Sequence, residues 1–181
     1  MNKQTGLTLI EMMISLAILA IMITTVAPSI QSILIKNRAV SEINELGSVI
    51  QFARNNAIDE QINTIVCPSA DFSVCSTNWN DPKIVFVDAD NNAVRGAGED
   101  LLVTSGAINA TNLMISSNNI LQFSASGEAN ANIRILLCHE DKAPEYARAL
   151  FVTLQGRVKM SGDSDKDGVN EDLNGNALSC L

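Results

Sequence analysis

The chain has 181 residues, 46% of them apolar, and its 20 Asp and Glu outnumber its 12 Lys and Arg, for a formal net charge of -8. This length fits one domain that can bury a sizeable core. The acidic balance argues against a protein built on general affinity for nucleic acid, because phosphate contacts require clustered Lys and Arg.

The first predicted element is an apolar segment over residues 7–35, in which Glu11 is the only charged residue. As a helix it reaches roughly 43 Å at about 1.5 Å per residue, and the hydrocarbon core of a bilayer is about 30 Å thick. A conventional signal peptide has a shorter apolar region with its cleavage site behind it, so we expect a membrane anchor. A carboxylate there costs about 2.5–3.5 kcal/mol at mid-bilayer, so Glu11 needs a partner.

A polar stretch, residues 1–6, precedes the apolar segment, and Gly6 stands at the junction. If the chain is cut after Gly6, the new ammonium on Leu7 lies one helical turn from Glu11. The ammonium of a neighbouring subunit would then neutralise this carboxylate during assembly. Further along, Pro28 removes a backbone donor and clashes with the preceding turn, so we expect a kink or local melting of the helix.

The string Gly6-Leu7-Thr8-Leu9-Ile10-Glu11 resembles the class III leader motif of type IV prepilins and type II secretion pseudopilins. The resemblance implies that a prepilin peptidase cuts after Gly6 and methylates Leu7, that Glu11 guides assembly, and that Pro28 bends the helix. Leu7 is a departure, because Phe usually follows the cut. Residues 1–6 would then be a leader, 7–35 a transmembrane and assembly helix, and 36–181 a head.

The helix is expected to continue beyond the membrane as an amphipathic half. Apolar residues at three- and four-residue spacing draw one stripe along it: Val40, Ile43, Leu46, Ile50, Ala53 and Ala57. This half should pack against the head. A dimeric coiled coil is the alternative, but the stripe is too short to favour it.

After Asn63 the pattern changes to short runs rich in Val, Ile and Leu, separated by clusters of Asn, Gly, Asp and Ser. The predicted strands are residues 64–67, 83–87, 101–104, 113–116, 120–123, 133–138, 149–154 and 157–160. Turns are expected at Asp90-Asn91-Asn92 and Ser126-Gly127-Glu128. The sequence therefore predicts an α+β fold, in which a long N-terminal helix packs on an antiparallel sheet or sandwich.

The head contains four cysteines: Cys67, Cys75, Cys138 and Cys180. None belongs to a C-x-x-C pair and the chain has one histidine, so a zinc site lacks convincing ligands. Disulfides in an oxidising compartment fit better. Of the three possible pairings, proximity favours Cys67–Cys75, which leaves Cys138–Cys180, but the sequence alone does not decide. Together with the family resemblance, the cysteines place the head outside the cytoplasm.

The last segment, residues 161–181, is an acidic loop. Asp163-Ser164-Asp165-Lys166-Asp167-Gly168 reproduces the D-x-D-x-D-G opening of calcium loops. The expected calcium ligands are Asp163, Asp165, Asp167, the carbonyl of Val169, and Glu171 or Asp172. Asn174 stands where a full loop has a bidentate glutamate, and a solvated acidic loop is the alternative. Asp88-Ala89-Asp90-Asn91-Asn92 is a poorer copy, for which we predict a hairpin turn.

The head carries a second resemblance, to the GspH/FimT class of minor pilins. The residues that carry it are Ala53-Arg54, Ala57, Cys67, Cys75, Trp79, Val85-Phe86-Val87-Asp88, Phe123 and Gly156-Arg157. It implies a structural subunit, single-pass in the inner membrane with its head in the periplasm, which joins other minor and major pilins in a filament. Such a subunit initiates or caps a type IV pilus used in adhesion, twitching motility or DNA uptake. A minor pseudopilin of a type II secretion system is the alternative, although the four cysteines favour the pilus.

DNA binding is a further alternative, because some FimT-type members bind DNA through a basic patch after such a Gly-Arg. Arg157 and Lys159 would point to one face of a strand. However, the residues from Ser161 onward carry five carboxylates against one lysine, a net charge of -4 that would repel phosphate.

No enzymatic activity is expected. The sequence contains no nucleophile elbow, phosphate loop or metalloprotease motif. The single histidine, His139, stands in an apolar run beside Cys138, where a structural or surface role is favoured.

Overall fold

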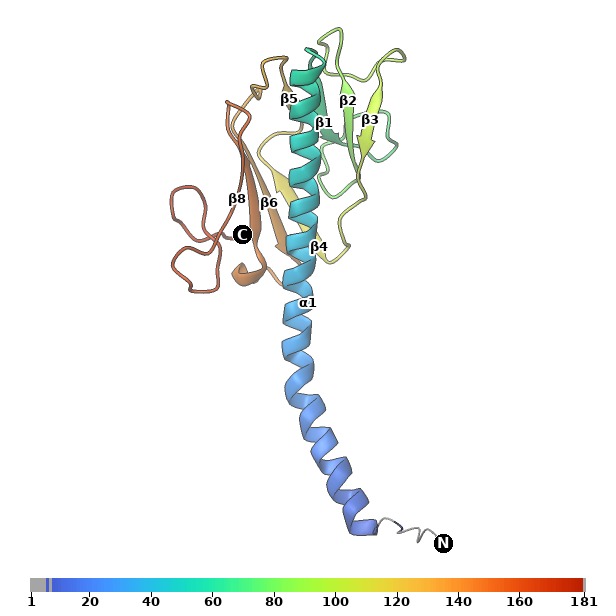
Figure 1. The fold of residues 1–181 in the computed structure, drawn as a ribbon, viewed down its shortest axis with the longest axis vertical. Coiled ribbons are helices and arrows are strands. Elements are labelled where there is room, and N and C mark those ends of the chain that lie inside the picture. Colours follow the sequence, from blue (N-terminus) through green and yellow to red (C-terminus); the bar gives the residue numbers. More distant parts are fainter. Residues whose placement is uncertain (1–5, 7, 181) are drawn as a thin grey trace. The chain divides into compact units, whose positions relative to one another are not determined.

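The computed structural model describes residues 6 and 8–180, apart from the side chains of residues 25–28. The helix α1 is continuous over Leu9–Asp59. The chain divides into two compact units, Met1–Asn37 and Arg38–Leu181. The second unit contains all the strands of the described residues (Figure 1), together with three apolar clusters and two disulfides. It is therefore held together without the N-terminal residues.

Eight strands follow α1 in the described part of the chain. They are β1 (Thr64–Pro68), β2 (Lys83–Val87), β3 (Leu101–Thr104), β4 (Asn112–Ser116), β5 (Leu121–Phe123), β6 (Ile133–His139), β7 (Arg148–Val152) and β8 (Val158–Met160), with a short 3-10 helix, η1 (Pro144–Tyr146), before β7. Every predicted run forms one of these strands. They make two four-stranded antiparallel sheets, sheet A in the order β3-β2-β1-β5 and sheet B in the order β4-β6-β7-β8. The predicted α+β fold is confirmed.

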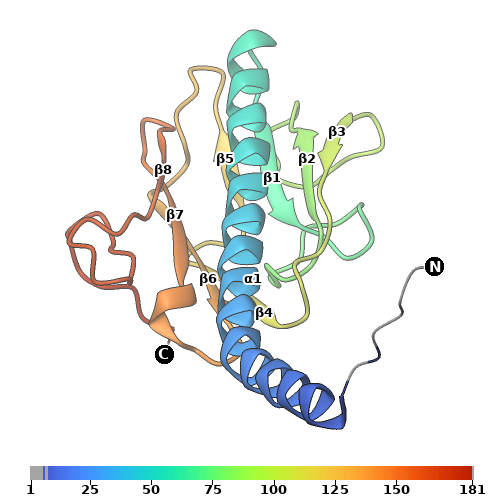
Figure 2. The same cartoon turned by 60° about the horizontal axis from the view of Figure 1, so that its bottom comes forward.

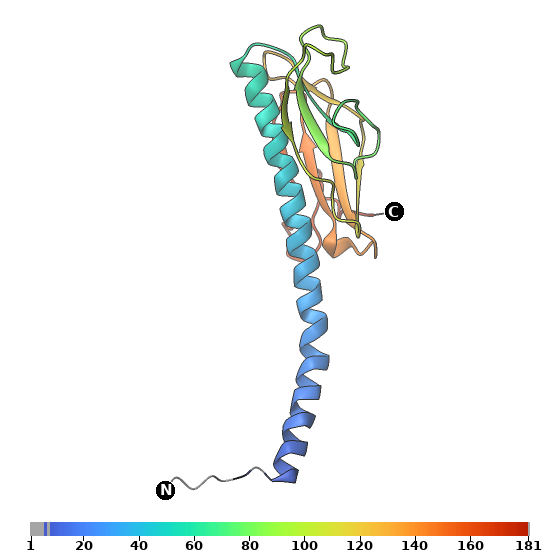
Figure 3. The same cartoon turned by 90° about the vertical axis from the view of Figure 1, so that its right-hand side faces the viewer.

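The head half of α1 lies against the inner faces of both sheets, as Figures 2 and 3 show. Its buried stripe, beside which Val49 is also buried, repeats at alternating four- and three-residue steps: Ala39, Ile43, Leu46, Ile50, Ala53 and Ala57. The prediction for Val40 is wrong, since the stripe begins at Ala39 and Val40 is 40% exposed. Val66 and Val85 of sheet A join the same cluster as Ile135 and Leu150 of sheet B. Each such fully buried side chain contributes about 1.5–3 kcal/mol.

Two polar side chains fix the position of α1 on the head. The Glu42 carboxylate accepts hydrogen bonds from the Asn109 N–H (2.8 Å) and from Nδ2 of Asn112 (2.7 Å). About three turns after Glu42 along the helix, Arg54 donates from Nε to the Gly127 carbonyl oxygen (2.9 Å) and from Nη2 to that of Gln155 (3.2 Å). These contacts select one register from the many that an apolar stripe alone would allow.

Each disulfide holds a segment of the chain over the outer face of one sheet. Cys67–Cys75 closes a loop beside the outer cluster of sheet A, which includes Ile84 and Phe86. Cys138–Cys180 ties the C-terminal segment to β6, where Leu178 packs with Phe151 on the outer face of sheet B. The four predicted cysteines are thus paired as their proximity favoured.

A lysine is buried inside the head. Lys83 is 2% exposed, and its Nζ donates to the carbonyl oxygen of Asp81 at 2.7 Å. Burial lowers the pKa of Lys83 to about 8, against the opposing attraction of Asp81, Glu42 and Glu45. The site therefore favours the neutral amine more than water does.

We expect the head to become more stable between about pH 8 and pH 10. In this window the folded chain has lost the Lys83 proton, whereas an unfolded lysine with a pKa of about 10.4 retains it, so stability rises with pH. The gain in the free energy of unfolding should be about 2–3 kcal/mol in urea titrations. Lys83→Met, whose unbranched side chain is one atom shorter and carries no titratable group, should remove this rise. An equal rise in the variant would contradict the assignment.

A second expectation concerns Gly156, which has φ +73°. A Cβ at this position would collide with the Gly127 carbonyl oxygen, the acceptor of the Arg54 hydrogen bond. Gly156→Ala should lower the free energy of unfolding by about 2–4 kcal/mol, because the left-handed conformation and the collision both add cost. Gly98→Ala is the matched control, since nothing lies within 4 Å of its added methyl. Comparable losses in both variants would contradict the close approach.

Candidate functional site

The first candidate site is the N-terminal half of α1. This is the one helix of the described residues that is long and apolar enough to cross a membrane, with a mean hydropathy of 2.3 in its most apolar window. The large apolar side chains that the structure describes between residues 9 and 34 are half-exposed or more, from Leu9 at 79% to Leu34 at 56%. Only lipid or the apolar helices of other subunits can shield this surface from water.

Glu11 interrupts this surface one turn into the helix. The Thr8 side chain caps the helix, because its Oγ1 accepts a hydrogen bond from the Glu11 N–H at 3.3 Å. The Glu11 carboxylate itself is exposed, and no salt bridge reaches it from the described residues. Thr8 and Glu11 have the spacing of a capping box, so the same glutamate favours the helix start and carries a charge into the apolar segment.

The remaining leader residues are less fully described. Gly6 is exposed and lies before the helix, and Leu7 falls outside the described residues. The helix α1 continues through position 28, so the structure shows no local melting there. Cleavage at Gly6, methylation of Leu7 and a bend at Pro28 stay predictions.

The second candidate site is the acidic loop. Carboxylate oxygens of Asp163, Asp165, Asp167 and Glu171 all lie within 4.8 Å of one another. The three aspartates are exposed and Glu171 is buried. Gly168 has φ +93°, and its N–H donates to Asp163 Oδ2 at 3.0 Å, which folds the loop back over its first residue. Four convergent carboxylates are the kind of donor set that calcium takes.

Asp172 does not belong to this cluster. Its Oδ1 accepts hydrogen bonds from the N–H groups of Asn174 (2.8 Å) and Asn176 (3.0 Å), which form a separate turn. The hydrogen bond from the Asn176 N–H makes the largest contribution to holding the pKa of Asp172 below its usual range. Of the two alternative closing residues, the structure therefore brings in Glu171.

Hydrogen bonds keep Glu171 ionised. Its Oε2 accepts from the Ser164 hydroxyl (2.7 Å) and from the Ser164 N–H (2.8 Å), and these bonds lower the pKa of Glu171. The contribution of Glu171 to stability is complete above the ordinary glutamate pKa of about 4.3 and is lost as the pH falls through the lowered value. Glu171 thus carries its charge at neutral pH.

The acidic loop is anchored to sheet B. The buried Asn170 donates from Nδ2 to the Ala147 carbonyl oxygen at 3.2 Å, and Leu178 and Cys180 pack on the sheet beyond it. Figure 1 shows this dark red segment looping beside β8. Burial lowers the pKa of the Arg148 guanidinium, and the attraction of Asp163 partly offsets this lowering.

A second acidic cluster lies between β2 and β3, where the sequence predicted a hairpin turn. Oxygens of Asp88, Asp90 and Glu99 approach within 4.8 Å of one another, and both Asp88 and Glu99 are buried. The connection does join the antiparallel neighbours β2 and β3, but it is a long loop over residues 88–100 and not a short hairpin turn. Glu99 returns to its start and accepts hydrogen bonds from the N–H groups of Ala89 and Gly96. Glu99 was not among the predicted site residues, although it stands at the twelfth position counted from Asp88, where calcium loops place their glutamate.

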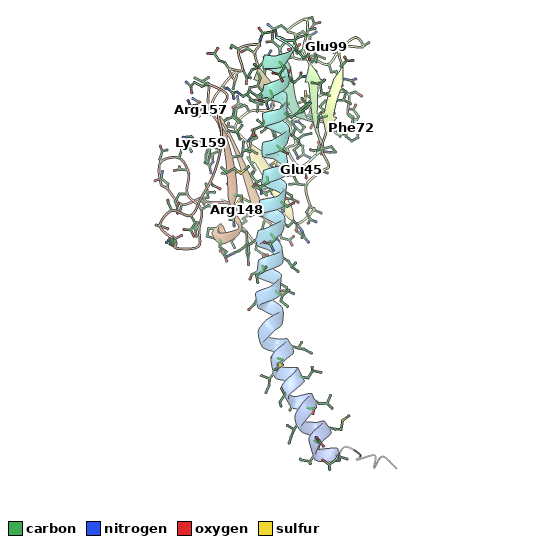
Figure 4. All side chains as sticks on the ribbon, in the orientation of Figure 1. Glu45, Phe72, Glu99, Arg148, Arg157 and Lys159 are labelled. Atoms are coloured by element: carbon green, nitrogen blue, oxygen red, sulfur yellow. A yellow bond between two sulfur atoms is a disulfide. The ribbon has the colours of Figure 1, made fainter. Side chains whose placement is uncertain are left out.

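The predicted basic pair, Arg157 and Lys159, lies at strand β8 of sheet B. Figure 4 labels Arg157 and Lys159 on the β8 side of α1, and Glu99 on the side of β2 and β3. Lys159 is opposite Phe151 in the β7–β8 register and so shares the outer face of sheet B. Next to this strand is an open groove of about 350 Å³, lined by Gln51, Arg54, Asn55, Gly156, Arg157, Val158 and Lys159.

His139 has a structural environment. It is 7% exposed, its Nδ1 lies 3.1 Å from Asp141 Oδ2, and its ring meets Tyr146 edge-on at 5.6 Å. Among the described side chains no serine or cysteine nucleophile is hydrogen-bonded to it. Its surroundings are those of a packed strand end.

Comparison with known proteins gives a consistent family. A family model described as "Type II transport protein GspH" matches residues 42–156, and one described as "Prokaryotic N-terminal methylation motif" matches residues 1–27. A comparison with curated proteins finds no match.

Solved structures share the fold. The type IV minor pilin FimU of Pseudomonas aeruginosa is similar with a TM-score of 0.56 and 19% identity, over 72% of this chain and 92% of that chain. The minor pseudopilin EpsH from the type II secretion system of Vibrio cholerae is similar with a TM-score of 0.52 and 11% identity, over 72% of this chain and 99% of that chain. One neighbour is thus a minor pilin and the other a minor pseudopilin, and at these identities the likeness shows the fold.

Proposed function

The chain belongs to the GspH family of type II transport proteins, whose model matches more than half of its length, and on this premise we propose that it is a minor pilin of a type IV pilus. As a member of the minor pilin and pseudopilin class, it is a membrane-anchored structural subunit with a periplasmic head. The proposed role is to initiate or cap a filament by inserting α1 among the helices of other pilins. A prepilin peptidase would first remove residues 1–6 and methylate Leu7.

The observation that carries this proposal is Glu11 exposed within an apolar helix whose first residues match the methylation motif. In lipid the carboxylate is costly, by about 2.5–3.5 kcal/mol at mid-bilayer. A neighbouring N-terminal ammonium removes that cost. The subunit is therefore driven from the membrane into the filament, where the partner charge is available.

We expect Glu11→Gln to reduce incorporation into filaments at least about tenfold, since it removes the charge that selects the assembled state. The measurement is an immunoblot of sheared filaments against the membrane fraction, with the full-length chain expressed in its own host. Glu60→Gln, at an exposed glutamate beyond the end of the same helix, is the control and should incorporate normally. Undiminished incorporation of Glu11→Gln would contradict the proposed role.

A minor pseudopilin is the second candidate, favoured by the description of the matching family and by the likeness to EpsH. Deletion of the gene separates the two functions. Loss of surface filaments and of twitching, with exported enzymes still secreted, supports the pilus. Loss of secretion with surface filaments intact would replace our proposal with the pseudopilus.

We also propose that the acidic loop binds calcium, because four carboxylates converge where no cation of the described residues forms a salt bridge with them. The expected ligands are Asp163, Asp165, Asp167 and Glu171. The ion would relieve their mutual repulsion and stiffen the segment that Cys138–Cys180 closes.

Millimolar calcium should raise the Tm of the 38–181 unit by about 3 °C or more, with a matching heat in titration calorimetry, while magnesium should do neither. The double variant Asp165→Asn, Asp167→Asn should lose both responses. Asp90→Asn, in the cluster between β2 and β3, should keep them. Absence of any calcium response in the unaltered protein would end the proposal.

A further inference from the structure

Strand β8 presents a free edge. The Thr153 N–H donates to the Arg157 carbonyl oxygen and the Ser161 N–H donates to that of Ala149, so alternate residues of this segment face β7. The backbone groups of Val158 and Met160 consequently point away from the sheet. Nothing in the described part of the chain hydrogen-bonds to them outside the strand ladder. These two residues offer unpaired donors and acceptors in alternation.

At the opposite edge of sheet B and at one edge of sheet A, side chains hydrogen-bond to outward backbone groups, unlike at β8. At β4, Oδ1 of Asn80 accepts the outward N–H of Met114 at 2.8 Å. At β5, Gln122 and Asn130 exchange backbone and side-chain hydrogen bonds along the edge. Proteins commonly cover such edges to prevent pairing with another chain. The uncovered edge at β8 is therefore available for pairing.

A groove runs beside this edge. Its volume is about 350 Å³, and α1 forms its other wall through Gln51, Arg54 and Asn55. The lining includes three cationic residues and no carboxylate, in a chain whose acids outnumber its bases by 20 to 12. This local reversal of charge favours an acidic partner.

We propose that the groove between α1 and β8 receives an extended acidic segment of a different filament subunit, which adds a strand to sheet B. The inference rests on the proposed function, because it needs a filament in which subunits meet. Pairing with Val158 and Met160 supplies main-chain hydrogen bonds, and the cations beside the groove select carboxylates. The chain's own acidic segments are folded into loops by internal hydrogen bonds, so a second copy does not supply this strand.

A polypeptide suits the groove better than a nucleic acid. The free edge offers carbonyl oxygens as well as N–H groups, and a phosphate backbone can use only the donors. The acidic loop that follows β8 carries a net charge of -4 and would repel a long polyanion that extends beyond the groove. A short acidic strand avoids that loop.

The test is photo-cross-linking of the full-length chain in its host, with a benzophenone amino acid in place of Gln51. We expect an adduct to an acidic, extended segment of another filament subunit, located by mass spectrometry. A second probe, in place of the exposed Ile14, reports filament assembly through α1. Adducts at position 14 without one at position 51 would overturn the groove proposal and leave the function standing. Absence of both would overturn the two together.

Two variants test how the segment is held. Met160→Pro removes an outward N–H without removing a bond to β7 and should lower the adduct yield about tenfold, whereas Met160→Ala, which keeps that N–H, should change it less than about twofold. The pair Arg157→Glu, Lys159→Glu should lower the yield about tenfold as well. Equal yields in Met160→Pro and Met160→Ala would overturn strand addition. A nuclease-sensitive adduct, or one to a second copy, would overturn the choice of partner.

Discussion

The apolar face of α1 between Ala39 and Ala57 is the constraint on which the head depends. Sheets A and B share no hydrogen-bonded strand pair in the described chain, so their inner faces are joined through this helix and the cluster around it. The stripe contains small residues, Ala39, Ala53 and Ala57, so the helix backbone can approach the sheets closely. Glu42 and Arg54 then fix the register, because Glu42 binds the connection into β4 and the first residue of that strand, and Arg54 binds two connecting loops. A change in either contact therefore affects both sheets at once.

The same helix faces two different environments along its length. The described large apolar side chains of its first half are exposed, whereas most of those in its second half lie in one buried stripe, with Val40 and Phe52 outside it. This division needs no break in the backbone, because helical hydrogen bonds are satisfied within the helix in lipid and in water alike. In the proposed function, one continuous element serves as membrane anchor and assembly surface, and its second half is part of the core of the head.

Much of this organisation could be predicted from the sequence, because it depends on local patterns. The strand runs are marked by their own Val, Ile and Leu content, and the membrane segment by its length. Val40 was misplaced because two apolar residues in succession leave the phase of a helix stripe ambiguous. Glu99 was missed because its role depends on a loop that returns to Asp88. The free edge of β8 could not be predicted either, since an edge is defined by what the rest of the chain fails to cover.

The two disulfides have a consequence for when the subunit is finished. Each one holds a segment over an apolar outer face, the first beside Phe86 and the second beside Phe151. Before oxidation both covers are held by noncovalent contacts alone, and the hydrophobic surface beneath them is open to solvent more of the time. Covalent closure of both covers therefore requires an oxidising compartment. A subunit that is still reduced therefore exposes more apolar surface, which favours aggregation with its neighbours and attack by proteases.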